Sequence, residues 1–295
     1  MNNYVMNKVI EDFPLEAKEV LNSIDNLIHN DKTLITKLSS FRDRFMKDVE
    51  ELSDIKEGLE EFSKELSVHI YTIHLYFILF CTEKLLKKYK SQNISEDIFW
   101  NTMKDIECKL MECHNVYEIW GVFVIDWYKR IFDLKCFALG RLQFEISKFR
   151  EDYPVYNNKG ITLHPGDELI FVHIPSIGAF TKELRMDSYR KAFSFFGKKP
   201  LVLACDSWLL YKDNIEFIDP KSNIIDFMKE FDIFFGESKD TFSDGWRIFG
   251  KDFELPAKKL PTNTSLQKAF AKRLLERKPV GDGVGILVFD GTRIL

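Results

Sequence analysis

"DELIFVHIPSIGAFTKELRMDSYRKAFSFFGKKPLVLACDS" (residues 167–207) is the stretch that decides the fold. Its two ends, "DELIFVHIP" (167–175) and "PLVLACD" (200–206), are apolar runs of strand length. The segment between them, "TKELRMDSYRKAFSFF" (181–196), has the composition and spacing of a helix. A strand, a helix and a strand in this order predict a βαβ crossover in which the two strands pair in parallel.

The joint between the first strand and the helix is a candidate anion site. Pro175 ends the strand, Gly178 permits a tight backbone path, and Thr181 is a suitable N-cap for a helix that begins at Lys182. Backbone N–H groups at a helix start can bind an anion, and the phosphates of a nucleotide-derived cofactor commonly sit at this position. One glycine taken alone is more typical of an ordinary capped turn, and both interpretations stay open.

Upstream of this unit the pattern is helical from about residue 14 to residue 137. Apolar residues recur three and four apart, with very few Gly and Pro, in "DKTLITKLSSFRDRFMKDVEEL" (31–52) for example. The apolar run "VHIYTIHLYFILFC" (68–81) is too short to span a bilayer and contains His69 and His74, so we expect a buried central helix. About five helices are predicted to form an N-terminal bundle.

The sequence changes its character near residue 138, where alternating segments begin. In "GRLQFE" (140–145), Leu142 and Phe144 are predicted to face one way and Arg141, Gln143 and Glu145 the other. Further on we expect a helix capped by Ser222 and a helix with a capping box formed by Thr264 and Gln267. The glycine-rich stretch "GDGVGILVF" (281–289) is expected to open the last strand with a turn. The predicted fold class is α+β: a helical N-terminal bundle (1–137) followed by a mixed α/β domain (138–295).

Composition restricts the class of protein. The chain has 295 residues, 45% of them apolar and 30% charged, which is typical of a globular protein with two domains. The net charge of −4 is unfavourable for a nucleic-acid partner. The five scattered cysteines do not form a disulfide framework, and the first twenty residues show no signal peptide, so we expect a cytoplasmic protein with no membrane partner. Cys108 and Cys113 have no second pair at zinc-site spacing, so no metal is expected.

Two titratable residues near strand ends are candidates for acid–base chemistry. Glu145 can act as a general base if burial raises its pKa, although the polar face of its strand is equally compatible with exposure to solvent. His173 lies near the carboxyl end of its strand, on the same side as Leu169 and Phe171, and histidine transfers protons near neutral pH. The alternative for His173 is a packed, hydrogen-bonded core residue.

The polar end of the second strand suggests a nucleophile but lacks its usual setting. Alternation places Cys205 and Ser207 on one face of the strand and Asp206 on the other. A serine nucleophile is typically held in a sharp turn with flanking glycines, which "CDSWL" (205–209) lacks. A cysteine nucleophile needs a positioned histidine, so a hydrolase that uses Cys205 is a third-ranked hypothesis. A position at the edge of a cleft explains the polar residues Cys205, Asp206 and Ser207 better.

The succession "GRLQFE", "VHIPSIGAFTKE", "CDSWLL", "SNIIDF", "WRIFG", "LPTNTSLQKAF" and "GDGVGIL" resembles a bacterial acyltransferase-like family. Its members combine a helical N-terminal domain with a C-terminal domain similar to the GNAT acyltransferase superfamily. "SEDIFWNTMKDI" (95–106) and the tryptophans Trp120 and Trp127 are similar to its N-terminal half, so the resemblance covers most of the chain.

The resemblance implies an acyl-coenzyme A donor and an amine as the acceptor, a small molecule. By position, the pyrophosphate falls on the loop formed by Ile174, Ser176, Ile177, Gly178, Ala179 and Phe180, with Lys182 adding charge. The resemblance also implies that the strand ending near 205–207 splays away from its parallel neighbour, and that the acyl-pantetheine arm enters the gap.

The function implied is an acyl-CoA-dependent N-acyltransferase of GNAT type, in which the amine attacks the thioester directly. Glu145 or His173 is then the expected base and Ser207 a polar contact. The substrate cleft is expected to contain Arg141, Gln143, Cys205, Asp206 and Trp208. The alternative is a non-catalytic protein that binds a ligand or partner on the same scaffold, which the single glycine of the loop favours.

Overall fold

Helix α5 (Ile70–Ser91) is the centre of the N-terminal helices, as the sequence predicts. It is buried at 13 of its 22 positions, and six other helices pack against it. Those helices are α1 (Tyr4–Val9), α2 (Leu15–His29), α3 (Lys32–Phe45), α4 (Ser53–Leu66), α6 (Glu96–Tyr117) and α7 (Ile125–Phe132). Burial on several sides explains why the sequence of α5 is apolar almost throughout.

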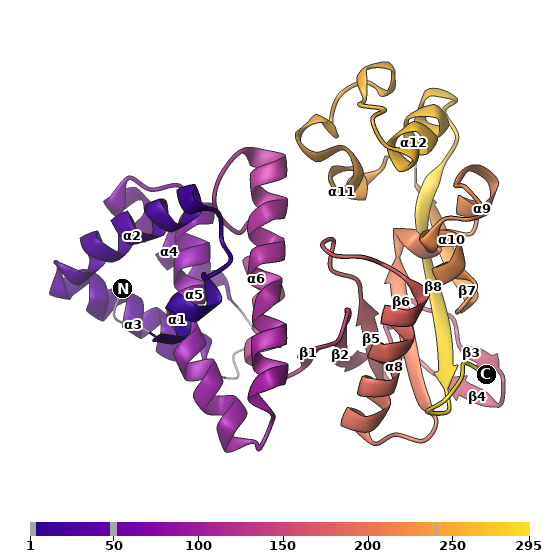
Figure 1. Cartoon of the computed structure of the whole chain (residues 1–295), viewed down its shortest axis with the longest axis horizontal. Helices are drawn as coiled ribbons and strands as arrows, with labels where there is room; N and C mark the ends of the chain where they lie inside the picture. Colours follow the sequence, from indigo (N-terminus) through magenta and orange to yellow (C-terminus); the bar gives the residue numbers. More distant parts are fainter. Residues whose placement is uncertain (1–3, 48–51, 240) are drawn as a thin grey trace. The chain divides into compact units, whose positions relative to one another are not determined.

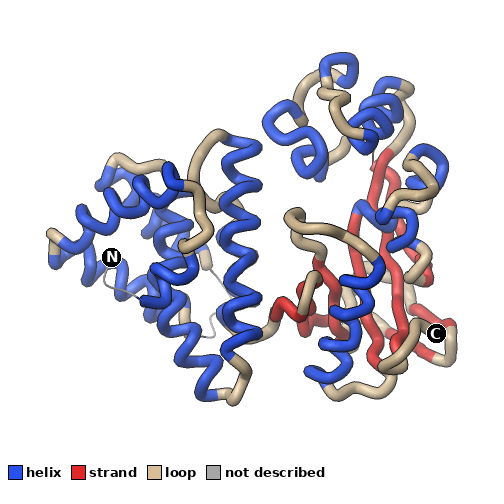
Figure 2. The backbone as a smooth tube through the Cα atoms, in the orientation of Figure 1, coloured by secondary structure: helices blue, strands red, loops and turns tan. Residues whose placement is uncertain are grey.

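The computed structural model describes residues 4–47, 52–239 and 241–295, and the chain divides into two units, Met1–Phe137 and Ala138–Leu295. Figure 1 shows the helices of the first unit, and in Figure 2 the described part of the chain has no strand before Cys136. Helices α1, of 6 residues, and α4, of 14 residues, have no counterpart among the predicted helices. The single helix expected over 31–52 is wrong, because α3 ends at Phe45; residues 48–51 lie outside the described part.

No single helix in the described ranges is long and apolar enough to cross a membrane. Within that part of the chain, one pair of consecutive helices, α4 and α5, reaches the required length and composition when taken together, and the chain bends by 113° between them.

The C-terminal unit is built on a six-stranded mixed sheet with the order β1-β2-β5-β6-β8-β7. A separate hairpin is formed by β3 and β4. The strands are β1 (Cys136–Leu139), β2 (Leu142–Lys148), β3 (Tyr156–Asn158), β4 (Ile161–Leu163), β5 (Glu168–His173), β6 (Leu201–Ser207), β7 (Asp232–Lys239) and β8 (Val280–Phe289). The helices are α8 (Lys182–Phe196), α9 (Asn214–Phe217), α10 (Asn223–Met228), α11 (Trp246–Phe249) and α12 (Ser265–Leu275), with short 3₁₀ turns such as η1 (Trp208–Leu210).

The predicted βαβ unit is confirmed: β5 and β6 pair in parallel and α8 connects them. Thr181 caps α8 by accepting from the Leu184 N–H, and Ser222 caps α10 in the same manner. Thr264 and Gln267 form the predicted capping box of α12. These caps lie within a few residues of the helix starts that they stabilise, which is why the sequence shows them.

The two faces of the sheet are covered differently. Helix α8 lies across one face (Figure 1), where Phe144 contacts Phe196 and Phe289 contacts Tyr189. The opposite face carries an apolar cluster that includes Tyr153. Other members of this cluster are Phe149, Tyr156, Leu163, Leu169, Phe171, Ala204, Val284, Ile286 and Val288. The predicted alternation of β2 follows from this, because Leu142 and Phe144 are buried on the α8 side.

The expected glycine-rich turn before the last strand is wrong. Strand β8 already begins at Val280 and runs between β6 and β7, so Gly281 and Gly283 lie inside the sheet. A Cβ atom on Gly283 would lie 2.0 Å from the carbonyl oxygen of Leu210, and one on Gly281 would lie 2.0 Å from that of Glu237. The glycines are therefore required by the close approach of neighbouring backbone, not by a turn.

Candidate active site

Strands β5 and β6 pair over a short distance and then separate. Their register contains two pairs, Ile170 with Leu203 and Phe171 with Ala204. Strand β5 continues to His173 and β6 to Ser207 beyond the last of these pairs. The carboxyl ends of the two parallel strands thus diverge, which is the arrangement that the sequence resemblance implied.

Glu145 and His173 meet on one side of this divergence. Strands β2 and β5 are antiparallel, and the register places Gln143 opposite His173 and Glu145 opposite Phe171. Nε2 of His173 lies 2.7 Å from Oε2 of Glu145, while the side chains are 29% and 12% exposed. A carboxylate bound to one ring nitrogen holds the neutral imidazole as the tautomer protonated at that nitrogen, so Nδ1 carries the lone pair. The two candidate bases therefore form one pair.

Asp206 lies at the equivalent position on the other strand. Its carboxylate accepts a hydrogen bond from the Tyr153 hydroxyl, and Nη1 of Arg150 lies 3.2 Å from Oδ2. Burial raises the pKa of Asp206 and outweighs the opposing effects of Tyr153 and Arg150. The side chain is still 30% exposed, so the carboxylate is both partly desolvated and accessible from solvent.

His173 and Asp206 share a face of the sheet. Each stands two residues beyond the last pair of the β5/β6 register, Phe171 and Ala204, and strand alternation keeps it on the face of that residue. Phe171 and Ala204 belong to the apolar cluster opposite α8. The sheet therefore presents the imidazole of His173 on β5, paired with the Glu145 carboxylate of β2, and the carboxylate of Asp206 on β6. All three lie on the same face, near the point where β5 and β6 separate.

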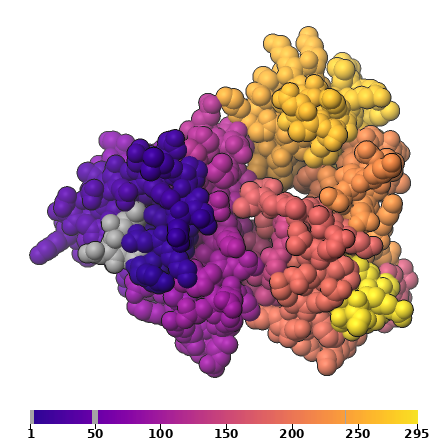
Figure 3. Space-filling view, viewed as in Figure 1, coloured from indigo at the N-terminus to yellow at the C-terminus, as the bar shows by residue number. Residues whose placement is uncertain are grey.

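The loop between β5 and α8 is the candidate binding loop. Ser176, Ile177, Gly178 and Ala179 are exposed, Ile174 and Phe180 are partly buried, and Lys182 is an exposed residue at the first position of α8. Gly178 has φ +85°, a left-handed conformation that glycine adopts without strain. Figure 3 shows α8 and the loop before it on the surface of the C-terminal unit.

Arg141 does not lie beside Gln143 and Glu145 in the strand, as the alternation suggested. It occupies the turn between β1 and β2, and its side chain reaches the binding loop. Its Nε lies 2.8 Å from the Ala179 oxygen and its Nη2 lies 2.7 Å from the Pro175 oxygen. Arg141 thus contacts the backbone of the loop that was predicted to hold the cofactor.

The remaining predicted cleft residues have structural partners. Cys205 is fully buried on the α8 face, which corrects the expectation that it lines an open cleft. Ser207 caps the 3₁₀ turn η1 by accepting from the Leu209 N–H, and Trp208 packs edge-on against Phe242 and Phe270. Gln143 is buried opposite His173 in the register.

Tyr153 and Arg150 are members of this site that the sequence did not indicate. They lie between β2 and β3, 53 and 56 positions from Asp206. Neither belongs to a motif of fixed spacing. Only the return of the chain across the sheet brings them to the end of β6.

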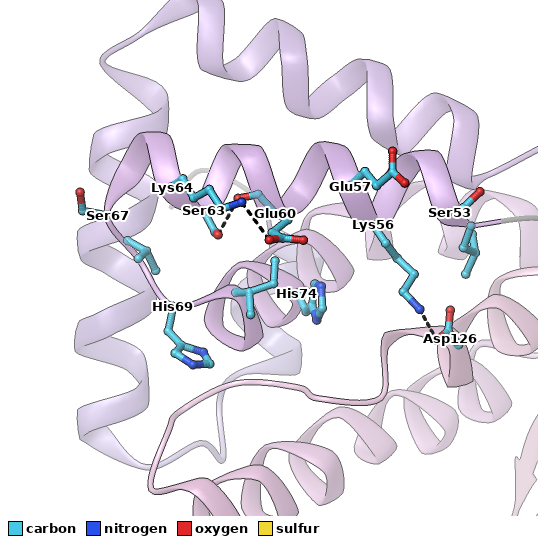
Figure 4. Close-up of a pocket in the computed structure, with 13 residues that line it drawn as sticks. Ser53, Lys56, Glu57, Glu60, Ser63, Lys64, Ser67, His69, His74 and Asp126 are labelled. Atoms are coloured by element: carbon cyan, nitrogen blue, oxygen red, sulfur yellow. Dashed lines mark hydrogen bonds and ion pairs between the residues drawn. The ribbon is translucent and has the colours of Figure 1, made fainter.

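A separate cavity lies in the N-terminal unit. Its volume is about 910 Å³ and it is open to solvent. Figure 4 shows the residues around it, with Lys56 paired with Asp126 and Lys64 with Glu60. The lining residues are Leu52, Ser53, Lys56, Glu57, Glu60, Ser63, Lys64, Ser67, Val68, His69, Ile70, His74 and Asp126.

Two histidines of this cavity have defined roles. Nδ1 of His69 accepts from the Tyr71 N–H and thereby caps α5, so Nε2 carries the proton of the neutral ring. Nδ1 of His74 lies 3.2 Å from the Val122 oxygen, and burial lowers the pKa of His74 to about 4. His74 is therefore neutral at physiological pH. In the lining of the cavity, Lys56 and Lys64 are thus paired with carboxylates, and His74 adds no charge.

Among the residues that the structure describes, no three His, Cys, Asp or Glu side chains are grouped so that they could hold a metal ion.

The diverging parallel strands, the capped helix between them and the mixed sheet define the class of the C-terminal unit as a GNAT-like fold. Solved structures of acyltransferases share it. One, in complex with decanoyl-CoA and teicoplanin, has a TM-score of 0.63 and 18% identity over 75% of this chain and 67% of that one. A second, with decanoyl-CoA, has a TM-score of 0.62 and 20% identity over 75% and 66% of the two chains. A mutant acyltransferase with octanoyl-CoA has a TM-score of 0.61 and 19% identity over 74% and 66%.

The family models agree with the fold. The model of the GNAT-like C-terminal domain matches residues 136–287, and that of the N-acyltransferase N-terminal domain matches residues 7–134. The chain belongs to this family of acyltransferases, in which a helical N-terminal domain precedes a GNAT-like domain. The sequence resemblance is confirmed. The chain spans about two thirds of the length of the solved acyltransferases. No protein of curated function matches its sequence.

Proposed function

We propose that this protein is an acyl-CoA-dependent N-acyltransferase that transfers an acyl group directly to an amine. The observation that carries the proposal is the placement of the Glu145–His173 pair beside the gap between β5 and β6, at the end of the strand that leads into the glycine-containing loop. Family membership and the acyl-CoA bound to proteins of the same fold support an acyl-CoA donor.

The loop fits the pyrophosphate of such a donor. The carbonyls of Pro175 and Ala179 are engaged by Arg141, and in a trans peptide the N–H points away from the carbonyl. The amides of Ser176 and Phe180 therefore face away from that guanidinium. Together with the start of α8 they offer partial positive charge to an anion, as do the amides at other phosphate-binding helix starts.

His173 is the proposed base. The amine nitrogen attacks the thioester carbonyl, a C–N bond forms, the C–S bond breaks, and the departing thiolate takes up a proton. Nδ1 of His173 accepts the proton that the amine loses, and the Glu145 carboxylate stabilises the resulting imidazolium. Asp206, partly desolvated on the opposite strand, is positioned to attract a cationic amine to the gap.

Calorimetry with acetyl-, succinyl- and decanoyl-CoA tests the donor. We expect binding of at least one, weakened in Gly178→Ala because a side chain at φ +85° strains the loop. Gly160→Ala is the matched control, since Gly160 has φ +72° in the β3–β4 turn and no atom within 4 Å of an added Cβ. Absence of binding by the unmodified protein would exclude the donor assignment and favour a non-catalytic binding protein.

The acceptor class is tested separately. Incubation with the bound acyl-CoA and matched pairs of compounds, each an amine and the alcohol of the same skeleton, followed by mass spectrometry, should give amides and release one coenzyme A per amide. Esters without amides would contradict the N-acyltransferase assignment.

A further inference from the structure

The binding loop is held by two arginines that approach it from different elements. Arg141, in the turn between β1 and β2, bonds the carbonyls of Pro175 and Ala179, which lie near the two ends of the exposed segment. Arg185, on α8, donates from Nη1 to the Phe180 oxygen at 3.0 Å. Three carbonyls of one short loop thus accept hydrogen bonds from two guanidinium groups.

The aromatic ring of Phe180 lies next to both cations. The guanidinium carbon of Arg141 is 5.5 Å from the ring centroid and that of Arg185 is 4.9 Å from it. Guanidinium groups interact favourably with the face of an aromatic ring at such distances. Phe180, which follows the exposed part of the loop, is consequently fixed through its carbonyl and through its side chain.

Arg185 is itself immobilised. Its side chain has no exposed surface, and its Nε and Nη2 bond the carboxylates of Glu230 and Asp226 at 2.6 to 3.2 Å. Burial alone would lower the pKa of Arg185, but Glu230 and Asp226 outweigh it and the pKa is raised. Arg185 therefore keeps its charge and its position.

Arg141 is positioned through Ser188, one helical turn after Arg185 on the same face of α8. The hydroxyl of Ser188 accepts from the backbone N–H of Arg141 at 2.8 Å and of Leu142 at 3.3 Å, and it donates to the Leu184 oxygen. Gly140 lets this turn approach, since a Cβ there would lie 2.8 Å from the Ser188 oxygen. A single face of α8 thus locates both arginines.

We infer that Arg141 and Arg185 are positioning residues that preorganise the loop for the donor pyrophosphate, and that Arg141 acts through the backbone without contacting the acceptor. The inference rests on the proposed function. By engaging the carbonyls, the two side chains turn the amides of Ser176, Phe180 and Thr181 in the opposite direction, where an anion would lie. Without these two side chains, the donor would have to order the loop when it binds. The entropy lost in that ordering would weaken the affinity for the donor.

The experiment compares decanoyl-CoA with decanoyl-pantetheine, which has the same thioester arm but no pyrophosphate. In the 295-residue chain, Arg141→Gln and Arg141→Lys should lower the affinity for decanoyl-CoA about 10- to 100-fold, since hydrogen bonds from a charged donor are lost, and leave the affinity for decanoyl-pantetheine unchanged. Ser188→Ala should act in the same direction. Arg190→Gln, on the exposed side of α8, is the matched control.

The outcomes distinguish a failure of the positioning role from a failure of the donor site. If the variants retain the preference for decanoyl-CoA, the positioning role is wrong although the donor site stands. If both ligands weaken equally, Arg141 supports the fold in general and the inference is also wrong. If the unmodified protein binds the two ligands equally, the loop does not hold a pyrophosphate, and both the donor site and the inference are rejected.

Discussion

The imidazole of His173 and the carboxylate of Glu145 are joined across two antiparallel strands by a 2.7 Å contact between Nε2 and Oε2. Each residue was a separate candidate for the base in the sequence. The contact makes them interdependent, because the carboxylate fixes the tautomer of the ring.

Replacement of His173 should remove most of the acyl transfer while sparing the donor site. Because a general base typically contributes 10²- to 10⁴-fold, His173→Gln should lower kcat by about that factor with an unchanged affinity for decanoyl-CoA. Glu145→Gln should also lower kcat, by a smaller factor. Steady-state kinetics and calorimetry measure the two quantities. His164→Gln, an exposed histidine of the same unit, is the control; equal kcat in all variants would show that the pair is not the base.

The five cysteines should be unreactive in the folded protein. All are buried, and burial raises the pKa of the Cys81, Cys113 and Cys205 thiols, to about 12 for Cys113. A thiol reagent should therefore label none of them until denaturant is added, when all five should react. Cys205→Ala should retain acyl transfer. Rapid and selective labelling of native Cys205 would revive the hydrolase hypothesis.

Gly283→Ala should destabilise the C-terminal unit. An added Cβ would lie 2.0 Å from the Leu210 carbonyl oxygen, so strand β8 or the turn η1 must move. Overpacking of this kind costs about 3 kcal/mol of the free energy of unfolding, whereas Gly160→Ala, where only φ is unfavourable, should cost about 1 kcal/mol. Urea denaturation compares the two. Similar losses of the free energy of unfolding in the two variants would mean that the backbone around β8 moves at little cost in free energy.

His74 should make the stability of the protein depend on pH between about 6.5 and 4. Burial lowers its pKa from 6.5 to about 4, against the opposing hydrogen bond to Val122, while Lys56 and His69 lower it further and Asp126 raises it. In this range the unfolded chain binds a proton that the folded chain does not, so the free energy of unfolding falls as pH falls. A difference of this size corresponds to about 3 kcal/mol.

The variant His74→Gln isolates this contribution. Its free energy of unfolding should decrease less than that of the unmodified protein between pH 7.5 and pH 4, whatever its absolute stability. Denaturant titrations at a series of pH values give both curves. Parallel curves would show that His74 is protonated equally in the folded and unfolded states.

The sequence indicated the βαβ unit, the caps at Thr181, Ser222 and Thr264, and the change from helices to strands, because each depends on residues within a few positions of one another. It also carried enough of the family pattern to predict the GNAT-like fold. The turn expected from the glycines of β8 was wrong. Gly283 is required because the backbone of the distant Leu210 approaches closely, and not because the chain turns there.

Tertiary structure alone decided the composition of the site. Glu145 and His173 are 28 positions apart, and Tyr153 and Asp206 are 53 apart, so only strand register and the return of the chain across the sheet could join them. Alternation along β6 already separated Asp206 from Cys205, but the packing of α8 decided which of the two is buried. Local periodicity fixes the face on which a side chain lies; the pairing of distant strands determines what it meets there.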